Sequence, residues 1–201
     1  MTSELYKPLE IKGWTVLITG ASSGFGWAAA WRFAELGCKL ILVARREERL
    51  KELAAEILTK YKDNEVQCLP CDMCDIKKVE GLLAALPLEF QKVDILVNNA
   101  GLALGKSPAH LNEASDVETM IATNVTSLIV ATSVFAKGMV ERGRGHVINV
   151  GSVAGHESYP GGSVYCATKH AVTAFTAATR HDLVGTPVRV TCISPGFAET
   201  E

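Results

Sequence analysis

Short runs of apolar residues alternate with longer segments of helical periodicity along the whole chain. The apolar runs contain few polar positions, which is typical of strands buried on both faces of a parallel sheet. They predict strands at residues 14–19, 39–43, 65–71, 93–97, 146–150 and 188–193. The segments between them predict helices at residues 24–36, 47–60, 76–86, 116–140 and 163–184. This alternation predicts a single α/β domain over residues 1–201, with a doubly wound parallel sheet in three α/β/α layers.

Composition narrows the classes of function. The chain has 201 residues, about the length of one domain at roughly 150 residues per domain. Hydrophobic residues make up 48% and charged residues 21%, which favours a packed core over disorder. The net charge is −2 and no basic stripe occurs, so the sequence argues against nucleic-acid binding.

The sequence shows neither a signal peptide nor a membrane span. Residues 1–10 mix charges, a proline and polar side chains, so they do not form a signal peptide. The longest uncharged runs, residues 13–31 and 119–136, are interrupted by glycines or by polar residues, unlike a membrane span. We therefore expect a cytoplasmic protein that binds no membrane.

Three of the six cysteines, Cys68, Cys71 and Cys74, have a spacing that also occurs in iron–sulfur and zinc sites. Cys68 and Cys71 fall in a predicted strand, where a step of three residues places side chains on opposite faces. No fourth ligand follows at a useful spacing. We therefore expect reduced thiols and no bound metal, with a metal protein as a distant alternative.

A glycine-rich segment, residues 19–26 (TGASSGFG), joins the first predicted strand to the first helix. Gly20 permits a tight turn, Gly24 allows the backbone to approach a pyrophosphate, and Gly26 allows the helix to pack close to the sheet. The N-terminus of the helix then offers free N–H groups to the phosphates. The segment predicts a dinucleotide site; the alternative is a plain glycine-rich turn.

The end of the second strand bears on the choice of cofactor. An NAD site of this kind usually has an acidic residue there, bonded to the ribose 2′-hydroxyl. This chain instead has Arg45 and Arg46, whose guanidinium groups suit a 2′-phosphate. We predict NADP(H), with both arginines as the phosphate clamp and Ser22 or Ser23 assisting. The alternative is that both arginines are solvated residues at the start of a helix.

The glycine spacing G-x-x-x-G-x-G after Thr19 resembles that of the short-chain dehydrogenase/reductase family. Further motifs follow in the order found in that family. They are Asp72 after the third strand, Asn98-Asn99-Ala100-Gly101 after the fourth, Asn124 in the long helix, Ser152 after the fifth strand, Tyr165-x-x-x-Lys169 in the next helix and Pro195-Gly196 after the sixth strand. The resemblance covers essentially the whole chain and implies a Rossmann fold.

Tyr165 and Lys169 lie four positions apart in a predicted helix, so their side chains share one face. A tyrosine ordinarily titrates near pH 10. Proton transfer near neutral pH therefore requires a positive charge that stabilises the phenolate, and the Lys169 ammonium supplies part of it. A Tyr–Lys pair on a helix is usually exposed at the surface and has no function. Here the presence of Ser152 and of the glycine loop favours a catalytic role.

The resemblance implies an NADP-dependent oxidoreductase in which hydride passes between the nicotinamide and a carbinol carbon. Tyr165 exchanges the hydroxyl proton, and Ser152 binds the substrate oxygen. Lys169 also binds the nicotinamide ribose, and Asn124 helps to hold a water for proton relay. The expected cofactor-binding set is Gly20, Ser22, Ser23, Gly24, Phe25, Gly26, Arg45, Arg46, Asp72, Met73, Asn99, Ala100, Gly101, Tyr165, Lys169, Pro195, Gly196, Phe197 and Thr200.

Four local segments narrow the resemblance to the NADP-dependent 3-hydroxy acid dehydrogenases, which oxidise serine, L-allo-threonine and related acids. They are residues 42–50, 98–105, 159–169 and 194–201. Carbonyl reductases and 3-oxoacyl reductases share much of this pattern and remain alternatives. The sequence identifies no group for the carboxylate of a hydroxy acid.

The resemblance also implies a longer protein and an oligomer. Complete family members continue through a lid helix and a seventh strand, whereas this sequence stops at residues 198–201, inside the substrate loop. We therefore expect a C-terminally short domain, and an NADP-binding module without turnover is an alternative function. We expect a homodimer or homotetramer formed through the helices at residues 116–140 and 163–184.

Overall fold

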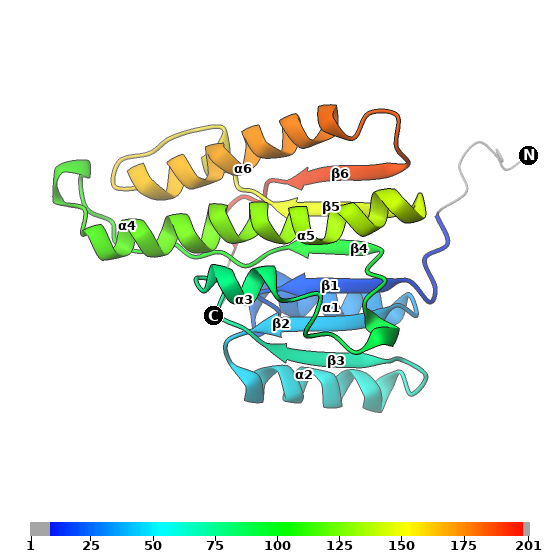
Figure 1. The fold of residues 1–201 in the computed structure, drawn as a ribbon. Coiled ribbons are helices and arrows are strands. Elements are labelled where there is room, and N and C mark those ends of the chain that lie inside the picture. Colours follow the sequence, from blue (N-terminus) through cyan, green and yellow to red (C-terminus); the bar gives the residue numbers. More distant parts are fainter. Residues whose placement is uncertain (1–8, 199–201) are drawn as a thin grey trace, which may run out of the picture.

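The computed structural model describes residues 9–198, in which six strands form one sheet (Figure 1). The strands are β1 (Thr15–Thr19), β2 (Lys39–Ala44), β3 (Val66–Pro70), β4 (Ile95–Asn98), β5 (Gly145–Val150) and β6 (Val188–Ile193). Every neighbouring pair is parallel, and the spatial order is β3-β2-β1-β4-β5-β6. The predicted doubly wound sheet is therefore confirmed, with its reversal of strand order between β1 and β4.

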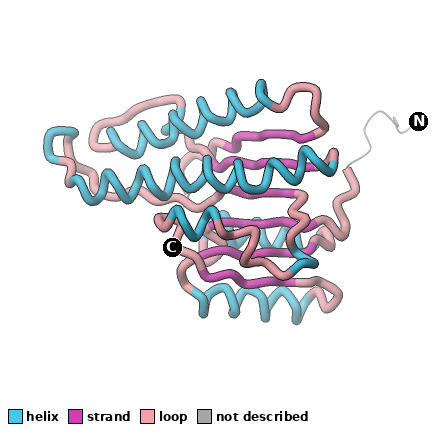
Figure 2. Tube along the Cα trace, in the orientation of Figure 1, coloured by secondary structure: helices cyan, strands magenta, loops and turns pink. Residues whose placement is uncertain are grey.

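Helices cover both faces of this sheet, which gives the predicted three layers (Figures 1 and 2). They are α1 (Gly24–Glu35), α2 (Glu47–Lys60), α3 (Ile76–Glu80), α4 (Ala114–Ile121), α5 (Ser127–Arg142) and α6 (Ser163–Asp182). A π-helical turn, η3 (Ala122–Thr126), joins α4 to α5, and 3-10 turns lie at η1 (Leu88–Phe90), η2 (Ala109–Leu111) and η4 (Val153–Gly155). Helices α1 and α2 pack on one face, and α3, α5 and α6 lie on the other.

The core consists of two hydrophobic clusters, one on each face of the sheet. In β1, Leu17 belongs to the cluster beneath α3 and α5, whereas Val16 and Ile18 belong to the cluster beneath α1 and α2. All three side chains are fully buried. The near-continuous apolar character of this strand thus reflects burial on both faces, as expected for a central parallel strand.

Two predicted helices differ from those observed. The helix expected at residues 76–86 ends at Glu80, because Gly81 follows and the chain continues as tight turns, such as the bond from Leu82 N to Val79 O. The helix expected at residues 116–140 extends from residue 114 to residue 142 and contains the π-helical turn. Neither difference moves a strand.

The cysteines at the end of β3 diverge. Cys68 packs against the cluster beneath α1 and α2, whereas Cys71 belongs to the cluster on the other face. The Sγ atom of Cys74 lies 2.9 Å from Oγ1 of Thr123. All six cysteines are free thiols, and residues 9–198 contain no group of three His, Cys, Asp or Glu side chains arranged to hold a metal ion.

Within the described residues, the helical segment Ala114–Arg142 is long and apolar enough to cross a membrane by length and composition alone. Core helices of soluble proteins pass the same test. In this fold, Ala131, Phe135 and Met139 of the segment are buried in the cluster against the sheet. Its apolar character is therefore partly explained by core packing.

A buried polar network connects this layer of helices to the sheet. Asn98, at the end of β4, donates to Thr132 Oγ1 of α5 and to Asn149 Oδ1 of β5, both at 2.9 Å. Asn149 in turn donates to Thr176 Oγ1 of α6 at 2.9 Å. The network fixes α5 and α6 against the strand ends next to the candidate active site.

Candidate active site

A large pocket of about 920 Å³ lies at the carboxyl ends of the strands. All six strands are parallel, so the residues that follow them meet at this one edge of the sheet. The pocket is lined by Gly20, Ser22, Ser23, Gly24, Phe25, Ala44, Arg45, Arg46, Cys71, Asp72, Met73, Asn99, Ala100, Gly101, Leu102, Ala103, Thr123, Val150, Gly151, Ser152, Val153, Ala154, Glu157, Ser158, Tyr159, Tyr165, Lys169, Pro195, Gly196, Phe197 and Ala198.

The glycine loop is tightly closed against the end of β4. Gly20 has a φ of 67°, and a Cβ atom there would lie 2.9 Å from Cα of Ala100. A Cβ atom on Gly26 would lie 2.3 Å from the carbonyl oxygen of Gly20. Both positions therefore require glycine. Ser23 begins α1 without a side-chain cap, so the first N–H groups of this helix remain available to a phosphate.

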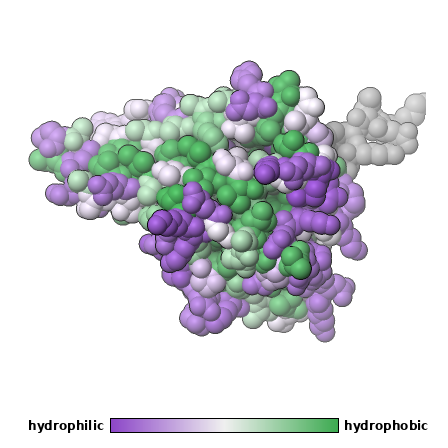
Figure 3. All heavy atoms as spheres, in the orientation of Figure 1, coloured by the Kyte–Doolittle hydropathy of each residue, from purple (hydrophilic) through white to green (hydrophobic). Residues whose placement is uncertain are grey.

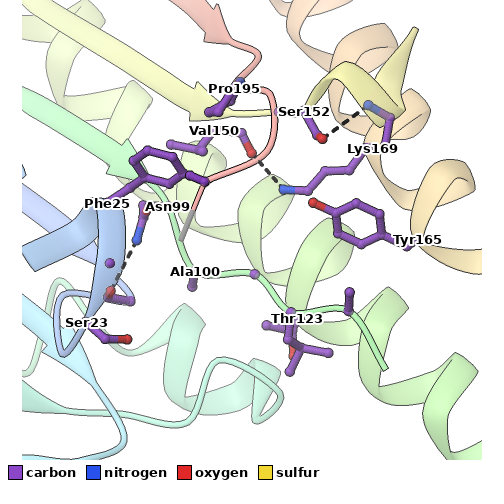
Figure 4. Close-up of a pocket in the computed structure, with 18 of the residues that line it drawn as sticks. Ser23, Phe25, Asn99, Ala100, Thr123, Val150, Ser152, Tyr165, Lys169 and Pro195 are labelled. Carbon is purple, nitrogen blue, oxygen red and sulfur yellow. Dashed lines mark hydrogen bonds between the residues drawn. The ribbon is translucent and has the colours of Figure 1, made fainter. Parts of the chain in front are cut away.

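Thr19 and Asn99 hold the ends of β1 and β4 together. The Asn99 side-chain amide donates to the carbonyl oxygens of Thr19 at 2.9 Å and Gly20 at 3.1 Å. The Thr19 hydroxyl accepts the N–H groups of Asn99 and Ala100, both at 3.0 Å. Figure 4 shows Asn99 next to the glycine loop. These bonds make the floor of the pocket rigid at the reversal of strand order.

The two arginines after β2 line the opposite end of the pocket from the Tyr165 helix. The Arg46 guanidinium donates from Nη2 to Ser22 Oγ at 3.2 Å and to Ser22 O at 3.4 Å. Arg45 is exposed. Asp72, after β3, accepts the N–H of Cys74 at 3.0 Å. Two arginines that line this end of the pocket, one of them bonded to a serine hydroxyl, suit a phosphate monoester.

Ser152, Tyr165 and Lys169 lie together at the β5 and β6 side of the pocket (Figure 4). Tyr165, which is half-buried, and Lys169, which is buried, come from the first two turns of α6. The Lys169 Nζ atom lies 5.8 Å from the centre of the tyrosine ring. The Ser152 hydroxyl accepts the N–H of Ala154 at 3.1 Å. No hydrogen bond among residues 9–198 engages the Tyr165 hydroxyl, which therefore remains available to a substrate.

Lys169 is a buried cation. Its side chain donates to the carbonyl oxygen of Val150 at 2.9 Å, and only 5% of the residue is exposed. Desolvation on burial lowers the pKa of Lys169 to about 8, an effect that Cys192 partly opposes. A positive charge thus lies beside Tyr165 at neutral pH, at a cost in folding free energy.

Asn124 lies in the π-helical turn and is almost fully buried. Its amide donates to the carbonyl oxygen of Leu102 at 2.8 Å and to Thr168 Oγ1 at 3.1 Å, and its oxygen accepts the N–H of Leu102 at 2.9 Å. The Asn124 side chain thus connects the segment after β4 to α6. Its partner in α6, Thr168, directly precedes Lys169. The expected role of Asn124 in holding a water stays a prediction.

Most of the expected site residues line the pocket, and among the described residues two do not. Gly26 packs beneath the glycine loop, and Asn124 lies behind Leu102. Thr200 lies outside the described residues. The expected residues Phe25, Met73 and Phe197 do line the pocket. The roles assigned to these side chains remain predictions, whereas their arrangement around one cavity is a feature of the structure.

Several lining residues were not among those predicted from the sequence. Ala44, Cys71, Val150 and Gly151 are at or directly after strand ends, so the parallel topology alone could have indicated them. Glu157, Ser158 and Tyr159 belong to the loop between β5 and α6. Tyr159 falls in a segment that carries the family resemblance, whereas no sequence motif points to Glu157 or Ser158.

Comparisons with known proteins agree with this geometry. The profile of the short chain dehydrogenase family matches residues 14–201. The NADP-dependent 3-hydroxy acid dehydrogenase of Schizosaccharomyces pombe is 44% identical over 194 residues, which are 95% of this chain and 74% of that protein. Sulfoacetaldehyde reductase 2 of Chromohalobacter salexigens is 49% identical over 187 residues, which are 92% of this chain and 73% of that protein.

A solved structure is also close. The closed form of serine dehydrogenase complexed with NADP+ matches with a TM-score of 0.87 and 47% sequence identity. The match covers 93% of this chain and 74% of that chain.

We predict that Lys169→Met stabilises the protein at pH 7 by about 2 kcal/mol, because methionine fills the space without a charge to desolvate. The folded-state pKa of Lys169, about 8, lies below the ordinary value of 10.5. The charged side chain therefore penalises the fold below pH 8, and the penalty disappears as the pH rises from 8 to 10.5. Urea unfolding at pH 7 and pH 10 measures the difference.

The control is Lys92→Met, which removes an exposed lysine. Its effect on the free energy of unfolding should be small at both pH values. A stability difference between wild type and Lys169→Met that does not shrink between pH 7 and pH 10 would show that the charge of Lys169 is not its cause.

Proposed function

The chain belongs to the short chain dehydrogenase family, and we propose that it is an NADP-dependent oxidoreductase that acts on the CH–OH group of small 3-hydroxy acids. The observation that carries this proposal is the convergence of Ser152, Tyr165 and Lys169 in one pocket with the glycine loop. The names of two relatives, a 3-hydroxy acid dehydrogenase and a serine dehydrogenase, support the substrate class. The substrate is thus a small molecule, such as serine or L-allo-threonine.

The proposed cofactor is NADP(H), which supplies hydride transfer when bound. The glycine loop and the start of α1 would hold its pyrophosphate, and Arg45, Arg46 and Ser22 would hold its 2′-phosphate. Asp72 and Met73 line the pocket beside these arginines and would contact the adenine. The close approach of backbone at Gly20 and Gly26 supports this assignment, because larger side chains would fill the cradle.

The catalytic roles follow from the available atoms. Tyr165 holds or accepts the substrate hydroxyl proton at its phenolic oxygen, which no described residue engages. The Lys169 ammonium stabilises the phenolate electrostatically, and Val150 O fixes its position. Ser152 orients the substrate oxygen by a hydrogen bond. Asn124 acts as a positioning residue, since it holds Leu102 and Thr168 at the edge of the site.

A carbonyl reductase that works on simple aldehydes and ketones is the second candidate. The reductase from Chromohalobacter salexigens favours it, because its name gives an aldehyde as substrate. The two candidates share cofactor, fold and catalytic residues, and differ only in the preferred substrate. We further propose that the chain acts as one dinucleotide-binding domain in the cytoplasm.

We predict that Arg45→Ala combined with Arg46→Ala weakens NADPH binding by about tenfold to a hundredfold and leaves NADH binding within about threefold. The reason is that only NADPH carries the 2′-phosphate that the guanidinium groups would bind. Fluorescence titration of both nucleotides measures this. Arg32→Ala, which removes an exposed arginine at the far end of α1, is the control. Equal wild-type affinities for NADPH and NADH would contradict the assignment.

We predict that Tyr165→Phe lowers kcat by about a hundredfold or more while NADPH binds as before, because only the proton-transferring hydroxyl is lost. The assay follows NADPH formation with serine, L-allo-threonine, 3-hydroxypropanoate and simple alcohols. Tyr61→Phe removes a hydroxyl outside the pocket and should retain full activity. Turnover of simple alcohols alone would favour the carbonyl reductase, and full turnover by Tyr165→Phe would refute the mechanism.

We propose that α4, α5 and α6 form the interface of a homodimer or homotetramer. Hydrophobic side chains gather over α4 and α5 in Figure 3, and Ile121 is 45% exposed there. We predict a multiple of 21.5 kDa by light scattering, and an association at least about tenfold weaker in Ile121→Asp. Leu58→Asp, at a similarly exposed site on α2, is the control. A monomeric wild type would contradict the proposal.

A further inference from the structure

The loop between β5 and α6 contributes an unassigned acidic residue to the pocket. Glu157, Ser158 and Tyr159 line the cavity from this loop, which lies between Ser152 and Tyr165 in the sequence. Glu157 is exposed, and none of the ion pairs among residues 9–198 includes it. Its carboxylate is therefore available to a ligand at this end of the pocket.

The backbone around Glu157 is well anchored. The carbonyl oxygen of Val153 accepts the N–H groups of His156 and Glu157, both at 2.9 Å, and the N–H of Val153 donates to Pro195 at 3.0 Å. The His156 ring lies 3.1 Å from the Ser194 hydroxyl. The backbone that carries Glu157 is therefore held in place, which limits the positions that its carboxylate can reach.

Glu157 differs from the other charged residues of the pocket in its position and exposure. The other charged lining residues are Arg45, Arg46, Asp72 and Lys169. The first three follow β2 and β3, on the opposite side of β1 from β5. Lys169 is buried and bonded to a carbonyl oxygen. Among the described lining residues, Glu157 is thus the exposed charge on the side of the pocket where the proposed substrate binds.

We propose that Glu157 is a specificity-determining residue that favours substrates with a cationic group, such as the ammonium of a 2-amino-3-hydroxy acid, over anionic substrates of the same length. This inference rests on the proposed function. An ammonium on the carbon next to the reacting carbinol gains an attractive partner in Glu157. A substrate with only a carboxylate or sulfonate meets repulsion from the same group.

DL-serine and 3-hydroxypropanoate provide the test, because they share a carbon chain and differ only in the ammonium group. We expect the wild type to have the higher kcat/KM for serine. In Glu157→Gln, the ratio of the two kcat/KM values should fall by about threefold to fivefold, as expected for an exposed charge pair. The change should lie in KM with kcat retained, and it should diminish at high salt.

Two further variants sharpen the result. Glu157→Lys should reverse the preference toward 3-hydroxypropanoate, because a lysine at this position repels the ammonium of serine and attracts the anionic substrate. Glu56→Gln removes an exposed carboxylate on α2, outside the pocket, and should leave the ratio unchanged. A ratio that stays within about twofold of wild type in both Glu157 variants would overturn the assignment of Glu157 alone. A wild type that oxidises neither compound would instead overturn the proposed function.

Discussion

The closure of the glycine loop on the end of β4 is the constraint on which the site depends. The Asn99 amide binds the carbonyl oxygen of Gly20, and Gly26 fits beneath it with no room for a Cβ atom. This contact fixes the direction of α1 and, through Ser22, the position of the Arg46 guanidinium. Because this contact lies where the strand order reverses, the glycine loop and α6 face each other across one cavity.

The side of the cavity that holds Tyr165 and Lys169 is maintained against a folding cost. A lysine that is 5% exposed carries its charge with a pKa near 8 and a single carbonyl partner, so the fold tolerates a penalty that a neutral side chain would avoid. The amide network from Asn98 through Asn149 to Thr176 holds α6, and hence Lys169, in place. Favourable packing elsewhere in the core thus offsets the cost of burying Lys169, whose positive charge the proposed chemistry needs.

Sequence patterns predicted the central strands β1, β2 and β4 well because they are buried on both faces, and that burial is visible as a nearly continuous apolar run. The family resemblance predicted most pocket residues, and the parallel topology explains why motifs after different strands meet at one edge. Sequence patterns placed the end of the third helix wrongly, because the tight turns after Gly81 form in its tertiary setting. The π-helical turn was not predicted either, and the partners of its Asn124 side chain, Leu102 and Thr168, lie far away in the sequence.

Glu157 escaped prediction for a related reason, as no spacing relates it to a strand end or to a helix face. Glu157 can be recognised as a pocket residue only from the fold, which places it in the same cavity as Arg45 and Lys169. The arginine half of the pocket then suits a nucleotide with an extra phosphate, and the half with an exposed carboxylate disfavours a second anion. A pocket with opposite charge preferences at its two ends can orient a cofactor and still distinguish among small hydroxy acids.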